Sequence, residues 1–269
     1  MQAVRGKGSA SRVSDAILET TGLTKEFRGF VAVNDVNLTV RRGTIHGLIG
    51  PNGAGKTTCF NLLTKFLPPT RGTIRYDGRD ITGMKPAEVA RLGLVRSFQI
   101  SAVFPHLSVL ENVRVALQRE RGGSFDFWRS ETLLRRYEDR ARELLEDVGL
   151  SAYANLQASD LPYGRKRALE IATTLALDPV MLLLDEPTAG MTHEDVDRVV
   201  ALVKRVAQGR TVLLVEHNLK VVQGLCDTIT VLARGAVLAE GDYAAVSRNP
   251  DVIAAYLGTE APPVEAAHG

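Results

Sequence analysis

A glycine-rich segment near residue 50 constrains this chain more than any other feature. Residues 50–57 read Gly-Pro-Asn-Gly-Ala-Gly-Lys-Thr, which fits the pattern G-x-x-x-x-G-K-[ST] at every fixed position. The segment follows the apolar run 45–49 and precedes a run with helical spacing, which is the context that the pattern requires. Backbone N–H groups and a helix dipole meet an anion in such a loop. The sequence therefore predicts a phosphate-binding loop in an α/β fold.

The side chains of this loop carry the expected chemistry. Lys56 supplies a positive charge for the β and γ phosphates, and the Thr57 hydroxyl is a predicted Mg²⁺ ligand. The predicted nucleotide-binding residues here are Gly50, Pro51, Asn52, Gly53, Ala54, Gly55, Lys56, Thr57 and Thr58.

Two adjacent acids follow a second apolar run. Residues 180–184 are typical of a strand buried on both faces, and Asp185, Glu186 and Pro187 come next. Acids that merely cap a strand and turn are the alternative interpretation. Ligands of doubly wound sheets bind at the carboxyl ends of the strands. We therefore expect Asp185 to hold Mg²⁺, directly or through water, and Glu186 to orient and deprotonate an attacking water.

The remaining pattern predicts alternating strands and helices. Short strands are expected over residues 38–40, 44–49, 72–76, 180–184, 212–215 and 229–232, and helices over 57–66, 129–148, 165–177 and 252–257. Buried strands that alternate with helices indicate an α/β fold with a parallel sheet.

Composition agrees with an ordered globular chain. Of the 269 residues 45% are hydrophobic and 24% are charged, which excludes a disordered chain, and a net charge of +2 argues against a dedicated nucleic-acid binder. Cys59 and Cys226 are too few for a disulfide scaffold, so we expect both to be small core residues. The sequence has no run of 18 or more apolar residues, so we expect no membrane span.

Two polar residues, Gln99 and His217, also follow apolar stretches. Either residue alone would be interpreted as structural. Together with the motifs above, the chain resembles the nucleotide-binding subunit of ABC transporters over about residues 17–258. The matching motifs are Walker A at 50–58, the Q-loop at Gln99, the Walker B strand and glutamate at 180–186, and the H-loop at His217. Phe27 stands where the family keeps an aromatic residue that stacks on adenine.

The resemblance implies a P-loop NTPase fold. Such a fold has a RecA-like core with a parallel sheet, a small antiparallel β subdomain and an α-helical subdomain. On this basis residues 1–15 are a flexible leader, 16–258 a single ATPase domain and 259–269 a flexible tail. Within the domain, 16–98 and 166–258 form the nucleotide-binding core with its β subdomain, and 99–165 form the helical subdomain with the signature motif.

The resemblance also implies a mechanism. Two subunits close head to tail on two ATP molecules with Mg²⁺, and each site joins the Walker motifs of one chain to the signature of the other. Gln99 senses the γ-phosphate and contributes to the metal site with Thr57 and Asp185, while residues 100–109 face membrane subunits. His217 stabilises the γ-phosphate in the transition state. The implied catalytic residues are Lys56, Gln99, Glu186 and His217, and the implied signature contacts are Pro162, Tyr163, Gly164 and Arg165.

The sequence departs from the general family in two places. Pro162 replaces the signature serine and Arg165 stands where glutamine is usual. Thr192 stands where the D-loop keeps aspartate. Backbone N–H groups at Tyr163 and Gly164 and the dipole of their helix can still meet a phosphate. These departures leave open whether two composite sites turn over equally, and they favour a heteromeric partner.

Several segments resemble the larger ATPase subunit of branched-chain (hydrophobic) amino-acid importers. They are residues 161–164, 189–191, 216–218, 240–241 and 250–258, with a helical insert at 118–135. The resemblance implies a second ABC ATPase, two transmembrane permeases and an extracytoplasmic substrate-binding protein as partners, without nucleic acid. It implies a peripheral location on the cytoplasmic face of the inner (plasma) membrane. The alternatives are a lipopolysaccharide-export-type ATPase, a soluble ABC ATPase and a P-loop module without useful hydrolysis; the solute itself stays open.

Overall fold

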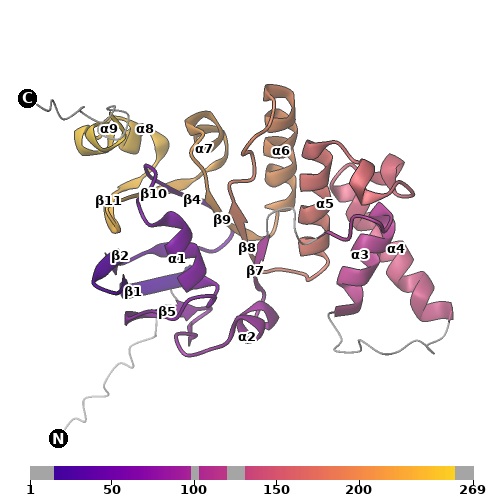
Figure 1. Cartoon of the computed structure of the whole chain (residues 1–269), viewed down its shortest axis with the longest axis horizontal. Helices are drawn as coiled ribbons and strands as arrows, with labels where there is room; N and C mark the ends of the chain where they lie inside the picture. Colours follow the sequence, from indigo (N-terminus) through magenta and orange to yellow (C-terminus); the bar gives the residue numbers. More distant parts are fainter. Residues whose placement is uncertain (1–14, 98–102, 120–130, 258–269) are drawn as a thin grey trace, which may run out of the picture.

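Two β-sheets and a set of helices make up the computed structural model, which describes residues 15–97, 103–119 and 131–257 (Figure 1). The first sheet has the strand order β11-β10-β4-β9-β8-β7. Neighbours from β10 to β7 are parallel, whereas β11 is antiparallel to β10. The strands are β4 (Ile45–Ile49), β7 (Leu94–Ser97), β8 (Met181–Asp185), β9 (Thr211–Val215), β10 (Thr228–Ala233) and β11 (Ala236–Gly241). Every residue of β8 and β9 is buried, as their apolar runs predict.

The second sheet is built around one long strand. The sequence predicts only short strands from residue 17 onward, but β1 (Ala16–Phe27) has 12 residues. Irregularities in its pairing, one of them near the positive-φ Gly22, let its first half pair with β3 and its second half with β2. The other strands are β2 (Phe30–Val36), β3 (Thr39–Arg41), β5 (Arg71–Tyr76) and β6 (Arg79–Asp80). β1 therefore pairs with three partners in the antiparallel sheet.

The described helices are α1 (Lys56–Leu63), α2 (Pro86–Arg91), α3 (Val109–Arg119), α4 (Glu131–Asp147), α5 (Tyr163–Leu175), α6 (His193–Val206), α7 (Leu219–Leu225), α8 (Tyr243–Ser247) and α9 (Pro250–Leu257). The sequence predicts that the first helix extends to residue 66, but α1 ends at Leu63 because Lys65 adopts a positive φ of 64°. None of the helices within the described ranges is both long and apolar enough to cross a bilayer.

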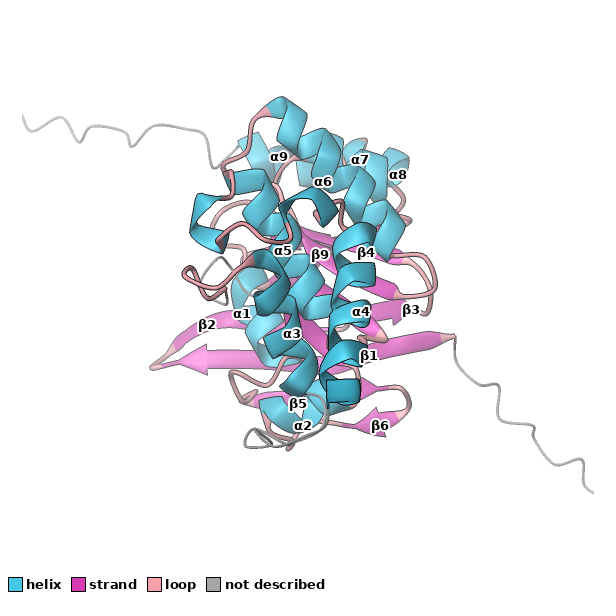
Figure 2. Cartoon of the chain, turned by 90° about the vertical axis from the view of Figure 1, so that its right-hand side faces the viewer, coloured by secondary structure: helices cyan, strands magenta, loops and turns pink. Residues whose placement is uncertain are grey.

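The parallel sheet is covered on both faces (Figure 2). Side chains of β8 alternate between two apolar clusters. Leu182 and Leu184 pack with α3, α4, α5 and α6, whereas Met181 and Leu183 pack with α1 and the antiparallel sheet. Cys59 is fully buried on the α1 side and Cys226 is partly buried, so both are core residues as predicted. In Figure 1, α3 and α4 lie at one end of the molecule and α8 and α9 at the other.

Buried His46 on β4 predicts a loss of stability in acid. Its Nε2 lies 2.8 Å from Thr230 Oγ1, and Thr230 donates in turn to Glu240 Oε2, so the ring donates in its neutral form. Burial lowers the pKa of His46 to about 4. Between pH 6.5 and 4, His46 is therefore protonated in the unfolded chain but stays neutral in the folded chain. We expect the free energy of unfolding to fall by about 3 kcal/mol over this range through His46, with no further loss below pH 4.

Chemical denaturation at pH 4 to 7 measures this effect. His46→Gln keeps a nitrogen donor toward Thr230 and removes the titration, so its stability profile should be flatter than that of the wild type. The control is His193→Gln, since the His193 side chain is exposed on α6. A His46→Gln profile as steep as the wild-type profile would contradict the assignment.

Candidate functional site

The glycine-rich loop joins the end of β4 to α1, and two of its glycines are packed against backbone. Gly50 has a φ of 149° and Gly55 a φ of 98°. A Cβ on Gly50 would lie 2.1 Å from the Leu232 carbonyl oxygen, and one on Gly55 would lie 2.5 Å from the Ala32 carbonyl oxygen. No side chain fits at either position, because β10 and β2 pack directly against the loop.

Lys56 is the first residue of α1 and folds back over this loop. Its Nζ donates to the carbonyl oxygens of Gly50, at 2.6 Å, and Pro51, at 2.9 Å. Burial lowers the pKa of Lys56, an effect that the nearby carboxylates of Glu186 and Asp185 oppose. Two carbonyl oxygens of the loop thus hold the ammonium. The Thr57 side chain is exposed.

Asp185 ends β8 with its carboxylate against an arginine. Arg96 Nη2 donates to Asp185 Oδ2, and both side chains are nearly buried, at 12% and 11% exposed. Arg96 also donates to Asn61 Oδ1 at 2.6 Å and lies over the Phe60 ring. The sequence predictions do not include Arg96, although a charge inside the apolar stretch 94–98 is a signal that could have identified it. The guanidinium of Arg96 therefore forms an ion pair with the Asp185 carboxylate within this chain.

Glu186 and His217 meet at the same edge of the sheet. Glu186 adopts a positive φ of 44°, and its N–H donates to the Val215 carbonyl oxygen of β9 at 2.9 Å. His217 Nδ1 lies 3.9 Å from Glu186 Oε1. Lys56, His217 and Glu186 thus follow β4, β9 and β8, which are neighbours in the sheet. Gln99 follows β7, the next strand, but lies outside the described residues.

The segment at residues 162–165 begins α5. Pro162 is the N-cap, and the Pro162 and Tyr163 side chains are exposed. Tyr163 Oη donates to the Ala189 carbonyl oxygen at 3.2 Å. A Cβ on Gly164 would lie 2.8 Å from Asp195 Oδ1, so this glycine packs against the first turn of α6. The start of α5 is therefore in contact with the loop that follows Glu186.

Arg165 stacks on an aromatic side chain of its own chain. The sequence predicts that Arg165 contacts nucleotide across a dimer; its guanidinium lies 4.2 Å from the centre of the Tyr153 ring. Its Nη1 also donates to the Gly149 carbonyl oxygen at 3.4 Å. A cation stacked on an aromatic ring is stabilised there, so Arg165 packs within the helical region.

Phe27 lies at the tip of the hairpin between β1 and β2. It is 40% exposed, pairs across the hairpin with Phe30, and has the Lys25 ammonium 5.1 Å from its ring centre. Phe30 is 68% exposed and is absent from the sequence predictions. The same hairpin contributes Ala32, the residue packed against Gly55, so the strand that follows this tip adjoins the phosphate loop.

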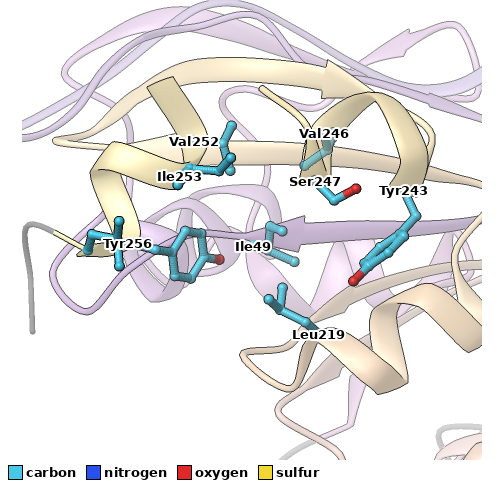
Figure 3. Close-up of a pocket in the computed structure, with 9 residues that line it drawn as sticks. Ile49, Leu219, Tyr243, Val246, Ser247, Val252, Ile253 and Tyr256 are labelled. Atoms are coloured by element: carbon cyan, nitrogen blue, oxygen red, sulfur yellow. The ribbon is translucent and has the colours of Figure 1, made fainter. Parts of the chain in front are cut away.

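An apolar cavity of about 300 Å³ is lined by Ile49, the residue before the phosphate loop (Figure 3). In Figure 3, Ile49 lies between Tyr256 of α9 and Tyr243 of α8, with Leu219 of α7 below it. Burial raises the pKa of the Tyr256 phenol, and a hydrogen bond from the Gly50 backbone opposes this shift. Helix α9 therefore contacts Gly50, the first residue of the loop.

Two family models match the chain. The model described as ABC transporter matches residues 33–189, a range that holds the glycine-rich loop and both acids. The model described as branched-chain amino acid ATP-binding cassette transporter matches residues 236–262, which include α8 and α9.

Curated relatives match over nearly the whole chain. The chain is 44% identical, over 91% of its length, to the high-affinity branched-chain amino acid transport ATP-binding protein BraF of Pseudomonas aeruginosa, of which 99% is covered. It is 42% identical, with the same coverage, to the corresponding LivG protein of Escherichia coli K12.

Solved structures of ATP-binding cassettes share the fold. The ADP conformation of the cassette MJ1267 superposes with a TM-score of 0.78 at 29% identity, covering 90% of this chain and 99% of that one. A dimeric post-hydrolysis state of the cassette MJ0796, bound to ADP and phosphate, gives a TM-score of 0.71 at 25% identity, covering 84% and 98%. These likenesses bear out the predicted P-loop NTPase fold.

Proposed function

The chain belongs to the ABC transporter family, and on this premise we propose that it is the ATP-hydrolysing subunit of an importer of branched-chain or other hydrophobic amino acids. The observation that carries the proposal is the 44% identity to BraF over 91% of this chain and 99% of that protein. The match of residues 236–262 to the branched-chain cassette model supports the same solute class. A match over nearly the whole of both proteins supports a shared role more strongly than a shared fold does, since one fold can host many functions.

The site has residues that suit ATP with Mg²⁺. Lys56 offers its ammonium to the phosphates, and the Thr57 hydroxyl and the Asp185 carboxylate are oxygen ligands of the kind that Mg²⁺ prefers beside substrate phosphates. Gln99 completes this set in our proposal. When bound, the ion neutralises charge that develops on the phosphates. Arg96 donates to the Asp185 carboxylate and orients it.

In our proposal, ATP hydrolysis uses Glu186 and His217, which follow β8 and β9. Glu186 is partly exposed at the sheet edge, so its carboxylate can accept a proton from water there. His217, 3.9 Å away, is placed to donate to the γ-phosphate as its charge grows. Phe27 and the start of α5 serve as adenine and partner-nucleotide contacts, respectively. Of the signature residues we propose Pro162, Tyr163, Gly164 and Arg165 for this contact; Arg165 also packs on Tyr153.

The assembly follows from the same proposal. This chain pairs with a second, different ABC ATPase and binds two permeases peripherally at the cytoplasmic face of the inner membrane. A substrate-binding protein outside the membrane delivers the solute.

Within this chain we propose two structural parts. Residues 16–98 with 166–258 form the nucleotide-binding core, and 99–165 form the helical subdomain.

Purification from the native cell tests the assembly. The chain carries a C-terminal tag, membranes are extracted in mild detergent, and the partners are identified by mass spectrometry. We expect two multi-span permeases and a second short ATPase, with solute import that fails when this chain is deleted. Recovery of a single permease pair with envelope-assembly proteins, or of soluble partners alone, would overturn the importer assignment.

A substitution at Gly164 tests the signature contact. Gly164→Asp adds a carboxylate where we propose that the partner's phosphate lies, and we expect ATP turnover to fall at least about a hundredfold. The new side chain also meets Asp195, so Gly164→Ala is the matched control for crowding within the chain. Activity of the purified complex separates the two effects. Gly164→Asp turnover equal to that of Gly164→Ala would contradict a phosphate contact here.

A further inference from the structure

A buried carboxylate, Glu216, joins the two loops that carry Glu186 and His217. Glu216 follows β9 directly and is 0% exposed. Its Oε1 accepts from the Thr188 N–H at 3.0 Å and from Thr188 Oγ1 at 2.6 Å. Its Oε2 accepts from the N–H groups of His217, at 3.1 Å, and Asn218, at 3.3 Å. One side chain therefore holds four donors from two separate loops.

These donors flank the residues that we assign to the chemistry. Thr188 lies two residues after Glu186, and the His217 N–H belongs to the histidine itself. Asn218 caps α7 by accepting from the Lys220 N–H, so the second loop is fixed at both ends. We propose that Glu216 is a positioning residue that sets the distance between the Glu186 carboxylate and the His217 ring. The inference rests on the proposed function, since it needs Glu186 and His217 to act in ATP hydrolysis.

The geometry calls for two accepting oxygens, as in a carboxylate, rather than for an amide. Both oxygens face N–H donors, and a glutamine amide would turn its own NH₂ group toward one of these pairs in either orientation. Burying a polar group costs little when hydrogen bonds satisfy it, and four of them reach Glu216. Glutamine at 216 therefore keeps the volume of the side chain and breaks one side of the link.

The test compares Glu216→Gln with the wild type in the purified transporter complex. Binding is measured with a fluorescent ATP analogue, and turnover by phosphate release. We expect Kd and KM to stay within about threefold and kcat to fall between about tenfold and a hundredfold, because a displacement of ~1 Å in a reacting group can cost about 10²-fold. Glu240→Gln is the matched control: Glu240 also accepts from a buried threonine, on β10, and we expect wild-type kcat.

A double variant separates positioning from general folding. If Glu216 acts through His217, the double variant Glu216→Gln with His217→Ala should turn over no more slowly than His217→Ala alone. Multiplying effects, or a kcat of Glu216→Gln equal to that of Glu240→Gln, would overturn the proposal. If Glu216→Gln does not fold, Thr188→Val carries the test by removing one donor, with a smaller fall in kcat and unchanged Kd expected. Unchanged kcat in that variant overturns the proposal, whereas absence of ATPase activity in the wild type would instead refute the proposed function.

Discussion

Glu186→Gln is expected to reduce ATP turnover by about 10²- to 10⁴-fold, the contribution typical of a general base. Glutamine cannot take a proton from water, but it keeps the size of the side chain and has no Cβ branch that would worsen the positive φ of 44°. ATP binding should persist because Lys56 and the glycine loop are untouched. Retained binding without hydrolysis should also prolong the closed dimer. Phosphate release, nucleotide binding and size-exclusion chromatography measure these three results.

The control for this variant is Glu194→Gln. Glu194 lies on α6 in a surface ion pair and is 84% exposed, so removing its charge should leave turnover near that of the wild type. Equal turnover in Glu186→Gln and Glu194→Gln would show that another group is the base.

Gly50→Ala is expected to disrupt the phosphate loop and to destabilise the fold. The new Cβ would lie 2.1 Å from the Leu232 carbonyl oxygen, which belongs to the backbone of β10 and cannot rotate away. The φ of 149° adds strain for any side chain. A forced shift of two central strands belongs to the rare class of single changes that cost about 4–5 kcal/mol or more. We expect the Tm to fall by about 10 °C or more and ATP binding to be lost.

Gly53→Ala is the matched control in the same loop. Gly53 also has a positive φ, of 76°, but a Cβ there would have no neighbour within 4 Å. It should cost only the conformational strain of the positive φ, about 1–2 kcal/mol, so we expect a smaller fall in Tm than for Gly50→Ala. Calorimetry and a binding titration compare the two variants. If Gly50→Ala and Gly53→Ala lower the Tm equally, close packing against β10 is not the reason for glycine at position 50.

The positions of Lys56, Glu186 and His217 at one edge of the sheet follow from local patterns. The segments that carry them follow apolar runs, and the carboxyl ends of parallel strands meet at one edge. Glu216 stands beside His217 in the chain, but its partner Thr188 is 28 residues away. Arg96 and Asp185 are separated by 89 residues. Such pairs depend on strand order, which no local pattern carries.

The fold shows the same division. The strands 44–49, 180–184 and 212–215 are confirmed to within a residue at each end because they are apolar and short. The sequence does not predict α6 as a separate helix. It predicts only short strands where the long strand β1 lies, because the pairing of β1 is irregular along its length. Arg165 stacks on the ring of Tyr153, twelve residues earlier in the chain, a contact that helical spacing alone does not predict. Strand pairing and side-chain stacking of this kind depend on tertiary contacts between segments, whereas a sequence pattern describes each segment separately.

The position of β4 in the sheet has a consequence for synthesis of the protein. β4 lies between β9 and β10, so the strand that ends in the phosphate loop is made early and gains its neighbours late. Gly43 and Thr211, which join by a hydrogen bond beside these strands, are 168 residues apart. Contacts of such long sequence separation form slowly, and unpaired apolar strands promote aggregation. On the ribosome, one edge of β4 stays unpaired until β9 emerges and the other until β10 emerges, so folding of the nucleotide site depends on nearly complete translation.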